Sequence, residues 1–88
     1  MFVILSYDVH KKRVNKVHKI AKKYLNWIQN SVFEGELTMA QLRKLKQELD
    51  DVIKPNYDSI LFYIYPNANY INKKFMGIDK SWYTSNIL

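Results

Sequence analysis

The sequence predicts an α+β fold of the ferredoxin-like type, βαββαβ, with an antiparallel sheet and both helices on one face. The order of the segments predicts it, because strand, helix, one or two strands, helix and strand follow each other along the chain. The length agrees, since 88 residues form one domain. We expect residues 1–66 to make this core domain and residues 67–88 to make an extra C-terminal strand and tail.

The first strand is predicted over residues 2–9, where a nearly continuous apolar run is typical of a central strand covered on both faces. Side chains alternate between the two faces of a strand. Phe2, Ile4, Ser6 and Asp8 therefore share one face, which becomes more polar toward the carboxyl end of the strand.

A basic amphipathic helix is predicted over residues 11–25. Its apolar stripe, at three- and four-residue spacing, consists of Val14, Val17, Ala21 and Tyr24, widened by Ile20 and Leu25. The segment from Lys11 to Lys23 holds half of the 14 Lys and Arg residues of the chain. Such a face attracts a polyanion such as nucleic acid, although a solvated lysine-rich helix explains the charge equally well.

Residues 27–34 are expected to be extended, and Gly35 permits a bend or bulge there. The pattern leaves open whether this region is one bent strand or two short ones. A second helix is predicted to begin at Thr38, which has capping-box spacing to Gln41, and to end before Pro55.

Residues 59–65 form a further strong strand that completes the core, and residues 69–77 have the composition of one more strand. With both helices on one side, the other face of the sheet is uncovered. Strands of this domain are apolar on both faces, so we expect the uncovered face to pack against something. A second copy of the chain is the economical candidate, and the sequence therefore predicts a homodimer.

The composition excludes several kinds of site. There is no cysteine, which removes disulfides, thiol catalysis and cysteine-ligated metals. Ser, His and acidic residues occur without the spacing of a catalytic triad, and the 2 glycines provide no phosphate-binding loop. No apolar run has membrane-spanning length and the N-terminus lacks the features of a signal peptide, so we expect a cytoplasmic protein without membrane contact.

Asp8 has an unusual setting, at the end of the first strand and beside a block of positive charge. A strand-end Asp commonly caps the helix that follows, and the residues alone favour that interpretation. The alternative is a metal site, because Mg²⁺ and Mn²⁺ prefer oxygen ligands and a two-fold axis near Asp8 would supply two carboxylates.

Three motifs stand out within a stretch, from residue 2 to about residue 66, whose residues follow a consistent order and spacing. They are Tyr7-Asp8-Val9, Arg13 with Asn15-Lys16-Val17, and Gln29-Asn30-Ser31-Val32-Phe33-Glu34-Gly35-Glu36-Leu37-Thr38. Together they resemble the small CRISPR-associated Cas-two family, which partners the Cas-one integrase in acquiring new spacers. The tail from residue 67 resembles this family in general character only.

The resemblance implies a homodimer with its sheets face to face and the C-terminal strand reaching the partner subunit. It also implies a Mg²⁺ site that Asp8 forms with its symmetry mate, and metal-dependent endonuclease activity on RNA or double-stranded DNA. In spacer acquisition, the resemblance implies that the dimer holds DNA as a bridge between Cas-one integrase dimers, where its catalysis is dispensable.

Carried over position by position, the resemblance makes Asp8 the metal ligand and a catalytic residue, with Tyr7 as its neighbour. It places Ser31 and Phe33 near the catalytic site. The residues expected to contact nucleic acid are Lys11, Lys12, Arg13, Lys16, Lys19 and Lys23.

Two positions depart from the family pattern. Trp27 stands where many members carry Arg, and Asn30 stands where Tyr is frequent. The missing arginine weakens the case for stabilisation of transition-state charge. Two other functions remain open: a VapD-like toxin ribonuclease, which shares the fold, and a purely non-catalytic DNA-binding adaptor.

Overall fold

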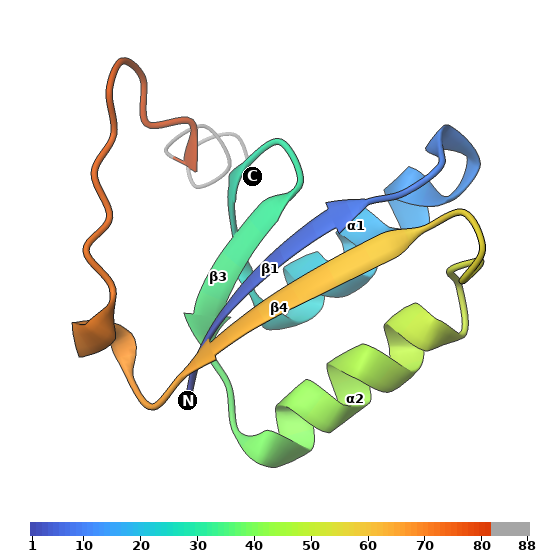
Figure 1. The fold of residues 1–88 in the computed structure, drawn as a ribbon, viewed down its shortest axis with the longest axis horizontal. Coiled ribbons are helices and arrows are strands. Elements are labelled where there is room, and N and C mark those ends of the chain that lie inside the picture. The colour runs from blue at the N-terminus through green and yellow to red at the C-terminus, as the bar shows by residue number, and fades with distance from the viewer. Residues whose placement is uncertain (82–88) are drawn as a thin grey trace.

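A computed structural model gives the fold and describes residues 1–81 (Figure 1). The sheet has four strands in the order β2-β3-β1-β4, and every neighbouring pair is antiparallel. The elements in chain order are β1 (Phe2–Asp8), α1 (Lys11–Tyr24), β2 (Asn26–Gln29), β3 (Val32–Glu36), α2 (Met39–Asp50), β4 (Ser59–Tyr65) and the 3-10 turn η1 (Ala68–Tyr70). This is the predicted ferredoxin-like order, so the α+β prediction is confirmed.

Both helices pack on one face of the sheet, and Figure 1 shows α1 behind the strands. Alternation along β1 puts Val3, Leu5 and Tyr7 on that face, where they are buried beneath the helices. Val17 of α1 and Leu45 of α2 belong to the same cluster, and both are 0% exposed. The opposite face of the sheet has no helix in the part of the chain that the structure describes.

The second helix begins as predicted. The Gln41 N–H donates to Thr38 Oγ1 at 3.1 Å, and the Thr38 N–H donates to Gln41 Oε1 at 2.8 Å, so the capping box is complete. Among the described residues, neither α-helix is long and apolar enough to cross a membrane.

The region 27–34 forms two short strands, and the turn between them lies at Asn30 and Ser31 rather than at Gly35. Asn30 has a φ of 45°, in the left-handed region that Asn tolerates better than most residues. Gly35 is inside β3, where an added Cβ would lie 3.3 Å from Leu25 Cδ2. The glycine therefore permits close packing against Leu25, and the regular pairing of β3 with β1 continues through Gly35 without a bulge.

The strand predicted over residues 69–77 is not formed in this single chain. Residues 68–70 make the 3-10 turn, and residues 71–79 have no helix or strand. A strand needs a neighbouring strand for its backbone hydrogen bonds, and this segment pairs with none in the described chain. It runs past the β3 side of the sheet (Figure 1), where Lys73 Nζ lies 2.5 Å from Glu34 Oε2. Residues 82–88 of the predicted tail lie outside the described residues.

Candidate functional site

Asp8 lies at the carboxyl end of β1, on the sheet face that carries no helix. In the antiparallel register with β4, Asp8 is opposite Ser59 and Ser6 is opposite Leu61. The Asp8 side chain is exposed and makes no hydrogen bond or ion pair with any residue from 1 to 81. Its carboxylate is therefore available to a ligand or to a second molecule on that face.

The interpretation of Asp8 as the cap of α1 is wrong. The N-cap is His10, whose Nδ1 accepts a hydrogen bond from the Lys12 N–H at 3.1 Å. The His10 carbonyl also accepts from the Arg13 N–H at 2.8 Å. Because His10 provides the acceptor that an N-cap must supply, Asp8 takes no part in starting the helix.

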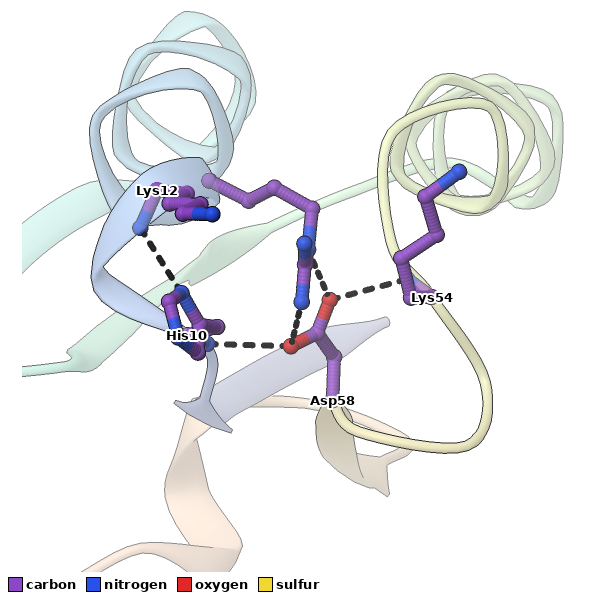
Figure 2. A network of polar contacts seen from close by, with 5 residues as sticks. His10, Lys12, Lys54 and Asp58 are labelled. Carbon is purple, nitrogen blue, oxygen red and sulfur yellow. Dashed lines mark hydrogen bonds and ion pairs between the residues drawn. The ribbon is translucent and has the colours of Figure 1, made fainter.

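A second aspartate, Asp58, lies just before β4 and its side chain is 0% exposed. Figure 2 shows it between the start of α1 and the connection after α2. Arg13 donates to both of its oxygens, from Nε at 2.6 Å and from a terminal nitrogen at 3.0 Å. The His10 N–H donates at 2.9 Å and the Lys54 N–H at 2.8 Å. The hydrogen bonds from Arg13 and from these backbone groups hold the pKa of Asp58 well below its usual range, so the carboxylate is ionised.

Beneath β1, on the helix-covered face, Tyr7 and Phe33 form an aromatic cluster with His18. The Tyr7 and Phe33 ring centroids are 6.2 Å apart, and those of His18 and Phe33 are 5.1 Å apart. The Tyr7 hydroxyl lies 3.4 Å from His18 Nδ1. Burial raises the pKa of Tyr7, and burial together with the charge of Lys22 lowers the pKa of His18, so both rings are uncharged at neutral pH.

The basic surface of α1 lies on the outer side of the helical layer. The buried residues of α1, Val17 and Ala21, face the sheet, and the helix contains no acidic residue. Its exposed lysines include Lys11, Lys12, Lys16 and Lys19. Since the helices cover one face of the sheet and Asp8 lies on the other, the lysines and Asp8 are directed to opposite sides of the molecule.

Residues 1–73 match the family model described as CRISPR associated protein Cas2. The chain belongs to the Cas2 family. This is the Cas-two family that the sequence motifs indicated, so the resemblance is confirmed. The match favours this family over the VapD-like alternative.

Relatives with related sequences cover nearly the whole chain. A Cas2 relative from Thermodesulfovibrio yellowstonii, named CRISPR-associated endoribonuclease Cas2 3, is 49% identical over 99% of this chain and 98% of its own length. The CRISPR-associated endoribonuclease Cas2 of Dictyoglomus turgidum is 47% identical over 92% of this chain and 93% of its own length. A crystal structure of Cas2 with 52% identity covers 92% of this chain and 91% of that chain, with a TM-score of 0.84.

Of the residues that the Cas2 resemblance placed near Asp8, the structure brings Ser31 to the same end of the sheet. The Tyr7 N–H donates to the Ser31 carbonyl oxygen at 3.2 Å. Tyr7 and Phe33 instead lie in the core on the helix-covered face. Side chains alternate along a strand, and both residues occupy positions that point away from the uncovered face. In the single chain they support the strands from the helix side, and their expected place near the catalytic site stays a prediction.

Two of the cations expected to bind nucleic acid are engaged in the fold. Arg13 is occupied by Asp58, which raises the pKa of the guanidinium through its hydrogen bond. Lys23 forms an ion pair with Glu48, which also accepts a hydrogen bond from the Tyr24 hydroxyl. These contacts join α1 to other elements. Arg13 is largely covered and belongs to the fold, whereas Lys23 remains 56% exposed and still contributes to the basic surface.

The two departures from the family pattern are connected. The Trp27 indole N–H donates to the Asn30 carbonyl oxygen at 2.9 Å, across the turn between β2 and β3. Asn30 takes the left-handed conformation that this turn requires. Trp27 also packs against the core, so it closes a hairpin and does not supply the charge that an arginine would provide there.

Sequence reasoning missed Asp58 and the cations of α2. An acidic residue between a turn and an apolar strand resembles any exposed loop residue, so no local signal marks Asp58 as buried. Arg43 and Lys44 are exposed on α2 and extend the positive charge of the helical layer. Their positions outside the apolar stripe of the second helix were a usable signal.

The Asp8 carboxylate fits a Mg²⁺ ion only as part of a larger site. No group of three or more His, Asp or Glu side chains that could hold a metal exists within the described residues. Mg²⁺ keeps several waters and uses one or two carboxylates together with substrate phosphates. An exposed carboxylate without an internal partner suits that role, and a second Asp8 or a phosphate would complete the ligand set.

Proposed function

We propose that this chain is a CRISPR-associated nuclease that acts as a homodimer, with the two Asp8 carboxylates directed at one phosphodiester. The observation that carries the proposal is the exposed carboxylate of Asp8, which has no partner within residues 1–81 and ends a central strand on the uncovered face. Relatives named endoribonucleases make RNA the first substrate to test, with double-stranded DNA as the alternative.

The uncovered face supports the dimer. Leu61 and Tyr63 of β4 lie on the same face as Asp8 and remain 49% and 48% exposed in the single chain. A two-fold interface places one patch against its own copy, so an axis near the end of β1 would bring one Asp8 close to the other. Two such carboxylates repel each other unless a cation or a proton lies between them.

The two Asp8 carboxylates would hold Mg²⁺, or Mn²⁺, together with phosphate oxygens and water. With a divalent ion bound between them, these carboxylates would hold a charge that could polarise the phosphodiester and lower the pKa of an attacking water. Asp8 contributes a fixed negative charge, and the regular β1–β4 pairing up to Ser59 determines the direction of its side chain.

The lysines favour a second role, in which the protein holds nucleic acid without cutting it. Lys12, Lys16 and Lys19 would neutralise backbone phosphates, which gives binding that is independent of base sequence and falls steeply with salt. The specific observation is that these lysines lie on the side of the molecule opposite Asp8. Binding through them would suit an adaptor that presents DNA to the Cas-one integrase, whether or not Asp8 cleaves.

One comparison of variants tests both roles. We expect Asp8→Ala to lower magnesium-stimulated cleavage by at least about 100-fold and to leave duplex affinity unchanged. Lys12→Glu with Lys16→Glu should weaken duplex binding and reduce its salt slope by about 2. Asp50→Ala, an exposed acid on α2, is the matched control.

Wild-type cleavage by rigorously purified Asp8→Ala protein would overturn the nuclease proposal. Spacer integration that survives Asp8→Ala but is lost in the lysine double variant would assign the biological role to the adaptor. Duplex binding that the double variant retains would overturn the adaptor instead.

A further inference from the structure

We propose that Asp58 is the positioning residue for Asp8. It holds both the chain that follows Asp8 and the neighbouring strand β4 in the geometry that a metal ligand needs. The proposal rests on the proposed function only in treating Asp8 as the ligand. The buried contacts of Asp58 carry the argument, and these belong to the single chain.

Asp58 joins its own region of the chain to the β1–α1 region, which is far away in the sequence. Its carboxylate accepts the His10 N–H from the β1–α1 connection, two bonds from Arg13 in the first turn of α1, and the Lys54 N–H from the connection after α2. Arg13 and Asp58 are 45 residues apart and His10 and Asp58 are 48 residues apart. One carboxylate thus fixes the end of β1, the start of α1 and the start of β4 relative to each other (Figure 2).

Asp8 lies between two of these fixed points. His10, two residues further along the chain, is held by its N–H bond to Asp58. Across the sheet, Asp8 pairs with Ser59, the residue that directly follows Asp58. A shift of Asp58 would therefore move both the chain that leaves Asp8 and the strand that supports it, while the distant end of β1 at Phe2 keeps its own pairing with Tyr65.

An ionised carboxylate is the group that this position requires. All four donors point at two oxygens, and a carboxylate accepts only, with room for about four hydrogen bonds. An asparagine would turn an NH₂ group toward at least one of these donors, and a buried donor without an acceptor is strongly unfavourable. Arg13 compensates the charge of Asp58 with a two-pronged contact that a lysine cannot reproduce.

The test compares wild type with Asp58→Asn by two measurements on the full chain: backbone amide NMR, and Mn²⁺ affinity from the electron paramagnetic resonance signal of free Mn²⁺. We expect amide shifts at Asp8 and Ser59 as well as at His10, with Phe2 unchanged. Mn²⁺ affinity should fall on the order of 10- to 100-fold, the usual effect of removing a residue that orients a ligand. A purely structural role would lower the melting temperature without changing Mn²⁺ affinity in the folded protein.

An unchanged Asp8 amide in folded Asp58→Asn protein would overturn the proposal, as would unchanged Mn²⁺ affinity when the wild type binds the ion. If wild-type protein binds no Mn²⁺, the nuclease proposal fails, and the amide shifts still decide whether Asp58 positions Asp8.

Two further variants keep the test decisive. If Asp58→Asn does not fold, Arg13→Lys keeps the charge but loses the two-pronged contact, and it should show smaller changes at the same amides. Asp50→Asn removes the same charge from an exposed position and should leave the Asp8 amide and Mn²⁺ affinity as in wild type.

Discussion

At the residue scale, two aspartates have opposite environments and therefore opposite uses. Asp8 is exposed, without a partner in residues 1–81, and is available to bind. Asp58 is completely covered and accepts four hydrogen bonds, so its carboxylate is fully used in contacts within the fold. Burying a charge is unfavourable unless it is paired and hydrogen-bonded, and Arg13 meets that condition. The two carboxylates lie at one end of the sheet, and in our proposal the buried one fixes the main chain around the exposed one.

The Arg13–Asp58 pair predicts how stability depends on pH. The folded-state pKa of Asp58 is depressed below its ordinary 3.8, so its stabilisation is fully present above that value and is lost as pH falls below it. Arg13→Ala removes the main cause of the depression. We expect the melting temperature to fall by at least about 10 °C at pH 7, and the gap to wild type to narrow below about pH 4.

Thermal unfolding followed by circular dichroism from pH 7 to pH 2.5 measures this gap. Lys12→Ala is the control, because Lys12 is exposed beside Arg13 on α1 and should cause little change at any pH. A constant gap for Arg13→Ala across the whole range would show that Arg13 stabilises by packing and not by its charge.

At the scale of elements, the sequence was sufficient wherever the signal is local. The three- and four-residue spacing in α1 and the capping box at Thr38 depend on neighbours in the chain, and the structure has both. The sequence left the number of strands in residues 27–34 open. Gly35 permits a bend, whereas here it admits the side chain of Leu25. The strand expected over residues 69–77 depends on a neighbouring strand, which no local pattern can reveal.

The β2–β3 turn gives a prediction at this scale. Asn30 has a φ of 45°, which β-branched residues disfavour strongly. We expect Asn30→Val to lower the free energy of unfolding by about 1–2 kcal/mol and Asn30→Gly to be nearly neutral. Chemical denaturation measures both, with Asn26→Val as control, since Asn26 is exposed in extended β2. An equal loss for Val at both positions would refute the turn as the cause.

At the scale of the whole molecule, the fold separates positive and negative chemistry. The helical layer presents the lysines of α1, and the opposite face of the sheet presents Asp8 beside apolar β4 side chains. Strand alternation and helical periodicity were enough to predict this separation, because both are properties of single elements. The contacts of Asp58 were beyond such reasoning, since they join residues up to 48 positions apart.

The proposed dimer predicts that the two faces of β4 respond differently to the same substitution. Leu61 and Ile64 are exposed to similar extents, 49% and 47%, but Leu61 shares its face with Asp8 and Ile64 shares its face with Val3, on the side of the helices. A glutamate at Leu61 would bury a charge between the two sheets, so we expect Leu61→Glu to weaken self-association at least about 100-fold and to lower magnesium-stimulated cleavage with it. Ile64→Glu should remain dimeric, because its face is not part of the interface.

Sedimentation equilibrium, with circular dichroism to confirm folding of both variants, makes the comparison. Equal weakening of self-association by the two substitutions, or a dimer unaffected by Leu61→Glu, would show that the two copies do not meet through the uncovered face.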